Sequence, residues 1–161
     1  MLHMQPRGSV ARTRAQDEAM KRHGELAVID PLVIVVDDDQ AVRNSLTFSL
    51  EVEGFAVRSY AGGHDLLEDG RDVPRGGCLV IDQRMPGMTG LELISKLRTR
   101  AVAAPAILVT SHPTAAVRQR AAKAGVRIVE KPLLGNALID VIRDLCTLAG
   151  PTGHSSAASP A

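Results

Sequence analysis

Aromatic side chains are almost absent from this 161-residue chain, which has two Phe, one Tyr and no Trp. Proteins that bind single-stranded nucleic acid stack bases on aromatic side chains, so the composition argues against this class of function. A surplus of one charge is missing as well, because 19 Lys and Arg are matched by 18 Asp and Glu. We therefore expect no direct nucleic-acid partner and no electrostatic attraction to an anionic membrane.

Cysteines and long apolar runs are also scarce. Cys78 lies in an apolar run and Cys146 in a helical pattern, without a CxxC motif or a Cys/His spacing typical of metal sites. Two buried thiols in a reducing compartment are the expected outcome. No apolar run approaches the ~18 residues of a membrane span, and no secretory signal begins the chain. These features predict a cytoplasmic protein.

Length and an apolar content of 45% predict one folded domain. Residues 1–29 form a leader that we expect to be disordered, because its first 24 residues include few large apolar side chains, and Met20 is an alternative start. Residues 30–149 form the domain. Residues 150–161, rich in Ser, Ala, Gly and Pro, form a disordered tail. Because this tail is too short for a further module, we expect a stand-alone domain.

Within the domain, short apolar runs alternate with helical patterns. The predicted strands are Leu32–Val36, Phe55–Ser59, Cys78–Ile81, Ala106–Val109 and Val126–Val129. The first predicted helix is capped by Asp39 and has Val42, Leu46 and Leu50 on one stripe. The third is marked by Leu91, Ile94 and Leu97. The second, fourth and fifth span Asp65–Asp69, Ala115–Ala124 and Leu134–Leu148. Five such units predict an α/β fold with a doubly wound parallel sheet. Its site should lie beyond the carboxyl ends of the strands.

Polar residues follow four of these strands. They are Asp37, Asp38 and Asp39 after the first strand, Asp82 after the third, Thr110, Ser111 and His112 after the fourth, and Lys131 and Pro132 after the fifth. Clustered carboxylates repel each other unless a cation lies among them, and their hard oxygens suit Mg²⁺. Lys131 and Thr110 can bind phosphate oxygens. Each residue alone could be a cap, a turn or a surface charge, but together they indicate phosphoryl transfer.

The chain resembles the receiver domains of two-component response regulators, especially the nitrogen-fixation regulator type. The resemblance covers roughly residues 31–148 and rests on the motifs VIVVDDDQAVRNSL, VIDQRMPGMTGLELI, ILVTSH and VEKP. It implies a flavodoxin-like (βα)5 fold with strand order 2-1-3-4-5. It also implies that Asp82 is the phosphoacceptor, and that Asp37 and Asp38 form the acidic pair of a Mg²⁺ site completed by Asp82 and the backbone carbonyl of Arg84. Thr110, with Ser111 beside it, matches the switch hydroxyl, and Lys131 matches the phosphate-binding lysine, joined to Pro132 by an expected cis peptide bond.

Three other positions bear on how such a switch would behave. Ile128 stands where the family commonly has Tyr or Phe, and its stiff β-branched side chain should alter the rearrangement. Arg84 and His112 lie two residues past Asp82 and Thr110. We expect these bulky side chains to shield phosphorylated Asp82 from water and to prolong its lifetime.

The predicted function is a phosphoacceptor switch that assists its own phosphotransfer and dephosphorylation but is not an enzyme in the usual sense. Its expected partners are a sensor histidine kinase or phosphotransfer protein and an unknown output protein. The output partner, and any homodimer, should use the fourth helix, fifth strand and fifth helix. The reason is an excess of apolar residues near that helix, namely Leu133, Leu134, Leu138, Ile139, Val141, Ile142, Leu145 and Leu148.

Two alternatives compete with this interpretation. A haloacid-dehalogenase-like phosphatase would use Asp37 as its nucleophile, but Asp82 lies in a DxxMPGxxG run and no acidic pair follows Lys131. A degenerate receiver that serves only as a binding module would not need all of the site residues. These are intact: Asp37, Asp38, Asp82, Thr110 and Lys131.

Overall fold

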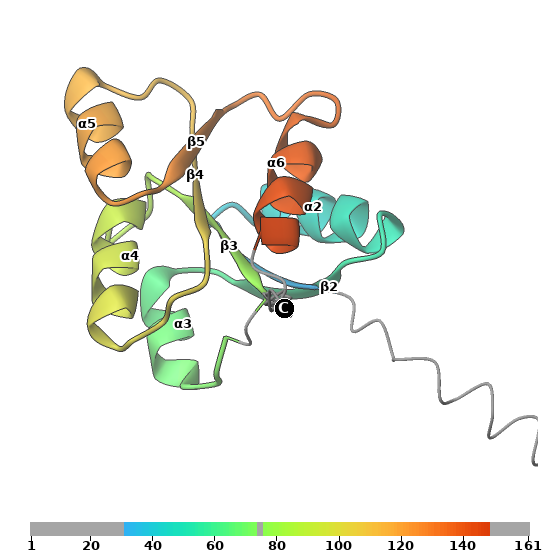
Figure 1. Ribbon diagram of the computed structural model, residues 1–161, viewed down its shortest axis with the longest axis horizontal. Coiled ribbons are helices and arrows are strands. Elements are labelled where there is room, and N and C mark those ends of the chain that lie inside the picture. Colours follow the sequence, from blue (N-terminus) through green and yellow to red (C-terminus); the bar gives the residue numbers. More distant parts are fainter. Residues whose placement is uncertain (1–30, 74–75, 149–161) are drawn as a thin grey trace, which may run out of the picture.

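Five parallel strands alternate with five helices in the computed structural model, which describes residues 31–73 and 76–148 (Figure 1). The elements are β1 (Leu32–Val36), α2 (Gln40–Val52), β2 (Ala56–Tyr60), α3 (Gly63–Asp69), β3 (Cys78–Asp82), α4 (Gly90–Thr99), β4 (Ala106–Thr110), α5 (Ala115–Lys123), β5 (Arg127–Glu130) and α6 (Ala137–Leu148). The strand order is β2-β1-β3-β4-β5. The predicted flavodoxin-like fold is therefore confirmed, while the predicted leader and tail lie outside the described residues.

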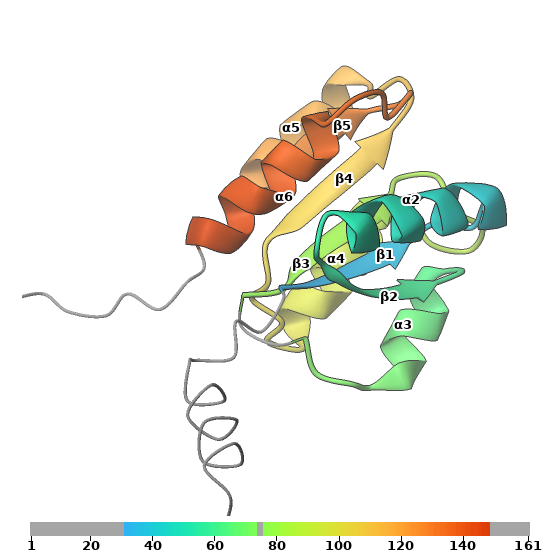
Figure 2. The same ribbon diagram turned by 90° about the vertical axis from the view of Figure 1, so that its right-hand side faces the viewer.

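The helices form two layers, with α3, α4 and α5 on one face of the sheet and α2 and α6 on the other (Figures 1 and 2). Successive side chains of a strand point to opposite faces, so Ile34 joins the core under the three helices and Val35 joins the core under the other two. Strands β3 and β4 are buried along their whole length. Burial on both faces explains why these strands are continuous apolar runs rather than alternating ones.

Two strands, β2 and β5, begin one residue later than the sequence predicted, because the backbone of the preceding residue completes a helix end. The N–H of Phe55 donates to the carbonyl of Leu50 at the end of α2, and β2 begins only at Ala56. Similarly, the N–H of Val126 donates to the carbonyl of Ala121, and β5 begins at Arg127. Both apolar residues are buried, but their backbone groups complete helix ends instead of strand pairs.

The last helix also begins later than predicted. It starts at Ala137 rather than Leu134, because Gly135 adopts a left-handed conformation with φ of +63° that a helix cannot contain. Most apolar residues of α6 pack against the core, with Leu138 and Ile142 buried and Ile139, Val141 and Leu145 partly buried. Leu133, in the segment before the helix, is partly buried against the same core. Their number therefore does not by itself indicate a docking surface, and the proposed use of α5, β5 and α6 stays a prediction. No helix within the described ranges is long and apolar enough to span a membrane.

Candidate functional site

Four predicted site residues meet at the carboxyl edge of the sheet. Asp37 directly follows β1, Asp82 and Thr110 end β3 and β4, and Lys131 directly follows β5. The parallel direction of the strands brings these positions to one edge. Thr110 is only 3% exposed, and Asp37 and Asp82 are only 3% and 7% exposed. Burial this deep is unusual for carboxylates and marks a site rather than a solvated loop.

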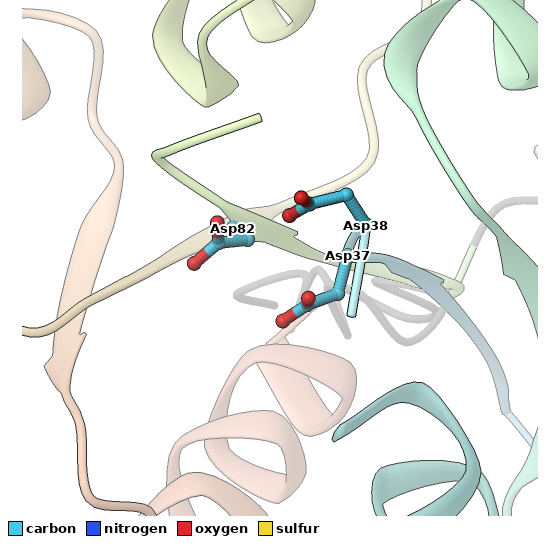
Figure 3. Close-up of side chains that lie close together, drawn as sticks. All are labelled: Asp37, Asp38 and Asp82. Carbon is cyan, nitrogen blue, oxygen red and sulfur yellow. The ribbon is translucent and has the colours of Figure 1, made fainter. Parts of the chain in front are cut away.

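Three carboxylates form a compact group at this edge. Asp37, Asp38 and Asp82 each place an oxygen within 4.8 Å of the other two, and their carboxylates point to the same side (Figure 3). Asp37 and Asp82 are buried while Asp38 is exposed. Two buried carboxylates beside one open to solvent, all with hard oxygen donors, fit Mg²⁺ with part of its water shell retained.

Lys131 is the cation that faces the two buried carboxylates. Its Nζ lies 3.1 Å from Oδ2 of Asp37 and 3.0 Å from Oδ1 of Asp82. Partial burial acts to lower the pKa of Lys131, but hydrogen bonds to Asp82 and Asp37 outweigh it, so this pKa is raised. Burial raises the pKa of Asp82 and the Asp37 charge adds to that effect, although Lys131 opposes both. One lysine therefore does not fully compensate the carboxylates, and a further cation would stabilise their charged form.

The loop after β1 is fixed by the third aspartate of the run. Asp39 caps α2, as predicted, by accepting hydrogen bonds from the N–H groups of Ala41 at 2.9 Å and Val42 at 3.2 Å. Its own N–H donates to Oδ1 of Asp37 at 2.9 Å. Arg43, one turn into the helix, donates to the carbonyls of Asp37 and Asp38 at 2.8 and 3.2 Å. Asp39 thus has a structural role, and the cap orients Asp37.

The loop after β3 holds Asp82 through contacts that the sequence motif alone did not assign. The N–H of Arg84 donates to Oδ2 of Asp82 at 3.0 Å, while the role of its carbonyl stays a prediction. Gln83 is buried, and its Oε1 accepts from the N–H of Leu91 at 3.1 Å. Its main-chain carbonyl accepts from the N–H of Gly90, also at 3.1 Å. Gln83 therefore ties the beginning of α4 to the end of β3.

Gly90 permits this close approach of helix to strand. A Cβ atom at Gly90 would lie 2.6 Å from the main-chain oxygen of Asp82 and 2.7 Å from Cδ1 of Leu108. The preceding Thr89 forms a capping box with Glu92, which fixes the same helix end. The MPGMTG segment was recognised in the sequence, but it did not reveal that Gly90 and Gln83 are needed for packing against Asp82.

The remaining predicted residues lie around this centre. Arg84, Thr110 and His112 line a cavity of about 560 Å³ between the loops that follow β3 and β4. The main-chain carbonyl of Thr110 accepts from the N–H of Lys131 at 2.9 Å, which joins the ends of β4 and β5. The Lys131-Pro132 peptide bond is cis, as expected. The other two predicted positions are Ser111, which is exposed, and Ile128, which is partly buried and packs against the core under the three helices.

Comparison with known proteins agrees with this geometry. Residues 33–143 match the response regulator receiver domain family. The chain is 40% identical over 112 residues to the transcriptional regulatory protein FixJ of Azorhizobium caulinodans, covering 69% of this chain and 53% of that protein. It is also 40% identical over 114 residues to FixJ of Rhizobium meliloti, covering 70% and 55%. The chain thus spans about half the length of these curated relatives.

Solved structures give the same result. The crystal structure of FixJ-N has a TM-score of 0.67 and 36% identity, covering 73% of this chain and 94% of that one. The structure of the response regulator StyR has a TM-score of 0.68 and 38% identity, covering 74% and 61%. With the acidic group, the lysine and the fold in agreement, the chain belongs to the response regulator receiver domain family, whose members are phosphoacceptor switches that work with histidine kinases.

Proposed function

We propose that Asp82 accepts a phosphoryl group from a phosphohistidine of a sensor histidine kinase or phosphotransfer protein, in the cytoplasm and with Mg²⁺. The convergence of Asp37, Asp38 and Asp82 within 4.8 Å of one another carries this proposal. Asp82 is the member that ends a fully buried strand. It contacts Lys131 at 3.0 Å, as Asp37 does at 3.1 Å. Family membership also disfavours a phosphatase that uses Asp37 as nucleophile.

The chemistry of the transfer follows from these contacts. A carboxylate oxygen of Asp82 bonds to phosphorus as the bond from phosphorus to the histidine nitrogen breaks. Lys131 is placed to bind the oxygens of the transferring group, because its Nζ already lies against the acceptor carboxylate. Bound Mg²⁺, held by Asp37, Asp38, Asp82 and the carbonyl of Arg84, would neutralise negative charge that develops during transfer.

Phosphorylation would then change the contacts at the ends of β4 and β5. The phosphoryl group adds negative charge and acceptor oxygens, so the Thr110 hydroxyl can turn towards it and donate a hydrogen bond. Lys131 and Thr110 are joined through their backbones, so movement at one is transmitted to the other. A partner that binds the α5, β5 and α6 surface would bind differently before and after this rearrangement. Ile128 would alter how far the rearrangement extends. A difference of only a few kcal/mol between the contacts made in the two conformations is enough to shift their populations.

Mass measurement after incubation with acetyl phosphate, or with a phosphorylated kinase, tests the acceptor. We expect one phosphoryl group on the wild type in Mg²⁺, none after chelation and none on Asp82→Asn. Asp65→Asn, which changes an exposed aspartate in the first turn of α3, is the matched control and should be phosphorylated normally. A phosphoryl group found on Asp37 in the Asp82→Asn variant would favour the phosphatase alternative.

The lifetime of the phosphorylated state tests Arg84 and His112. These side chains line the same cavity beside the acceptor loop, where they can exclude the water that hydrolysis requires. We expect faster loss of the phosphoryl group in Arg84→Ala and in His112→Ala than in the wild type. Unchanged decay in both variants would show that these side chains do not shield the site.

A further inference from the structure

A groove of about 670 Å³ runs between α2 and the segment that joins β5 to α6. Three large apolar side chains of the described ranges are strongly exposed, namely Phe48, Val52 and Leu134 at 69%, 68% and 76%. Phe48 and Val52 line the groove, and Leu134 lies between two residues that line it, Leu133 and Gly135. The exposed apolar surface is therefore concentrated at one place, which is typical of a covered or binding surface.

The chain enters the domain beside one end of this groove. Leu32, at the beginning of β1, pairs with Ala56, and Ala56 follows the end of α2 at Val52 by four residues. Whatever precedes β1 therefore starts close to Val52 and Glu53, which line that end of the groove. The other end is formed by Ala41 and Lys131, next to the acidic loop.

The residues before β1 match the groove in length. Helix α2 has 13 residues, so the groove beside it is about 20 Å long at ~1.5 Å per residue. Residues 20–30 can span up to about 35 Å when extended, at ~3.3 Å per residue. This segment can therefore turn back and follow α2 from Val52 to Ala41.

The same residues match the groove in chemistry. Four apolar residues, Leu26-Ala27-Val28-Ile29, are nearest to β1 and so to Phe48 and Val52. Lys21 and Arg22 lie further from β1, at a distance along the chain that reaches the loop before α2. Residues 37–53 carry five acidic residues and one basic residue. Residues 20–30 also contain Glu25 and Asp30, so the charge complementarity is confined to Lys21 and Arg22 opposite the acidic loop at residues 37–39.

We propose that residues 20–30 bind intramolecularly in the groove between α2 and the β5–α6 segment. Leu26, Val28 and Ile29 cover Phe48 and Val52, and Lys21 and Arg22 approach the acidic end of the groove. The segment then lies along the α2 face up to Lys131, at the border of the phosphoacceptor site. This inference does not depend on which aspartate is phosphorylated.

Paramagnetic broadening in the full-length chain tests this contact. A nitroxide is attached to the cysteine of a Gly24→Cys, Cys146→Ser variant. Cys78 can stay, because it is fully buried and burial raises the pKa of its thiol to about 12, so it should not react. We expect selective loss of amide signal from residues 45–52. The loss should disappear when Leu26, Val28 and Ile29 are all changed to Asp, and persist in the matched triple variant with Asp at Leu2, Met4 and Val10.

Two results would overturn the proposal. One is the absence of selective loss over residues 45–52 in the spin-labelled chain. The other is loss that occurs equally in a mixture of spin-labelled protein and separate isotope-labelled protein, because the groove would then be occupied by a second copy. A dye that binds apolar surfaces gives an independent measurement. It should bind several-fold more to the Leu26, Val28 and Ile29 variant than to the wild type, and adding Phe48→Ser and Val52→Ser should remove that increase.

Discussion

The interior residues of β3 and the residue at its carboxyl edge are both buried, but burial stabilises the fold in the interior and disfavours the charged side chain at the edge. Leu79 and Ile81 are fully buried, and removing such apolar surface from water stabilises the fold. Asp82, one residue later, is 7% exposed, and burial raises its pKa because the charged form loses its hydration. The interior therefore supports stability, whereas the edge keeps a carboxylate whose charged form is disfavoured by burial, which fits the proposed role of Asp82 in phosphoryl transfer. Substitutions in the two regions should have separable effects.

Lys131→Ala should have the largest effect, because it removes the cation that contacts both Asp37 and Asp82. By analogy with the loss of one charge-stabilising group in other sites, we expect phosphorylation to slow by about 10²–10³-fold. Mg²⁺ binding should be largely kept, since the role proposed for the lysine is to bind the phosphoryl oxygens rather than the metal. Phosphorylation rates at saturating Mg²⁺ and metal titrations would measure the two effects. Equal loss of metal affinity and rate would contradict this division of roles.

Leu79→Ala tests the interior of the same strand. Leu79 is 0% exposed, and removing its side chain should lower the free energy of unfolding by about 3 kcal/mol, through lost burial and a residual cavity. The folded fraction should still be phosphorylated on Asp82 at a near-normal rate. Urea denaturation and phosphorylation of the same preparation measure both. Leu134→Ala is the control, because Leu134 is 76% exposed and its truncation should change stability little.

Gly90→Ala tests the point where interior and edge meet. The added methyl would lie 2.6 Å from the main-chain oxygen of Asp82, so the start of α4 must move away from β3. We expect a loss of about 2 kcal/mol of stability together with slower phosphorylation, unlike either single-region variant. Gly62→Ala is the control, since a Cβ there meets nothing within 4 Å. Normal phosphorylation in Gly90→Ala would mean that the contact does not position Asp82.

Tyr60→Phe should have the smallest effect. Tyr60 ends β2 at the same edge of the sheet but is not part of the acidic group. The Tyr60 hydroxyl donates to Asp69. Burial and this hydrogen bond raise the pKa of Tyr60, and the hydrogen bond lowers the pKa of Asp69. The Tyr60 contribution to stability is present below pH ~10 and is lost as pH rises through its raised pKa. The Asp69 contribution is present above pH ~3.9 and is lost as pH falls through its lowered pKa.

The Tyr60→Phe variant should therefore have a flatter dependence of stability on pH at both extremes, with phosphorylation near neutral pH unchanged. Denaturation midpoints measured from acid to alkaline pH provide the comparison. Parallel profiles for wild type and variant would mean that the hydrogen bond contributes nothing to the pH dependence.

Much of the fold could be predicted because hydropathy is a local property of the chain. All five strands and five helices were predicted in the right order, since strands buried on both faces must be apolar runs. The errors lie at boundaries such as Phe55 and Val126, where backbone hydrogen bonds complete a helix end. Hydropathy does not report where a backbone N–H is used, so these boundaries were not predictable from the pattern.

The sequence by itself determined which residue types follow each strand, and hence that Asp37, Asp82, Thr110 and Lys131 share one edge. This was possible because parallel strands end at the same side of a sheet. Only the tertiary structure decided that Lys131 bridges two buried carboxylates and that Gln83 and Gly90 pack α4 against Asp82. It also decided that Phe48 and Val52 line a groove in which the described residues 31–73 and 76–148 leave them uncovered. Distances and loss of hydration depend on segments far apart in the chain, and no local pattern encodes them.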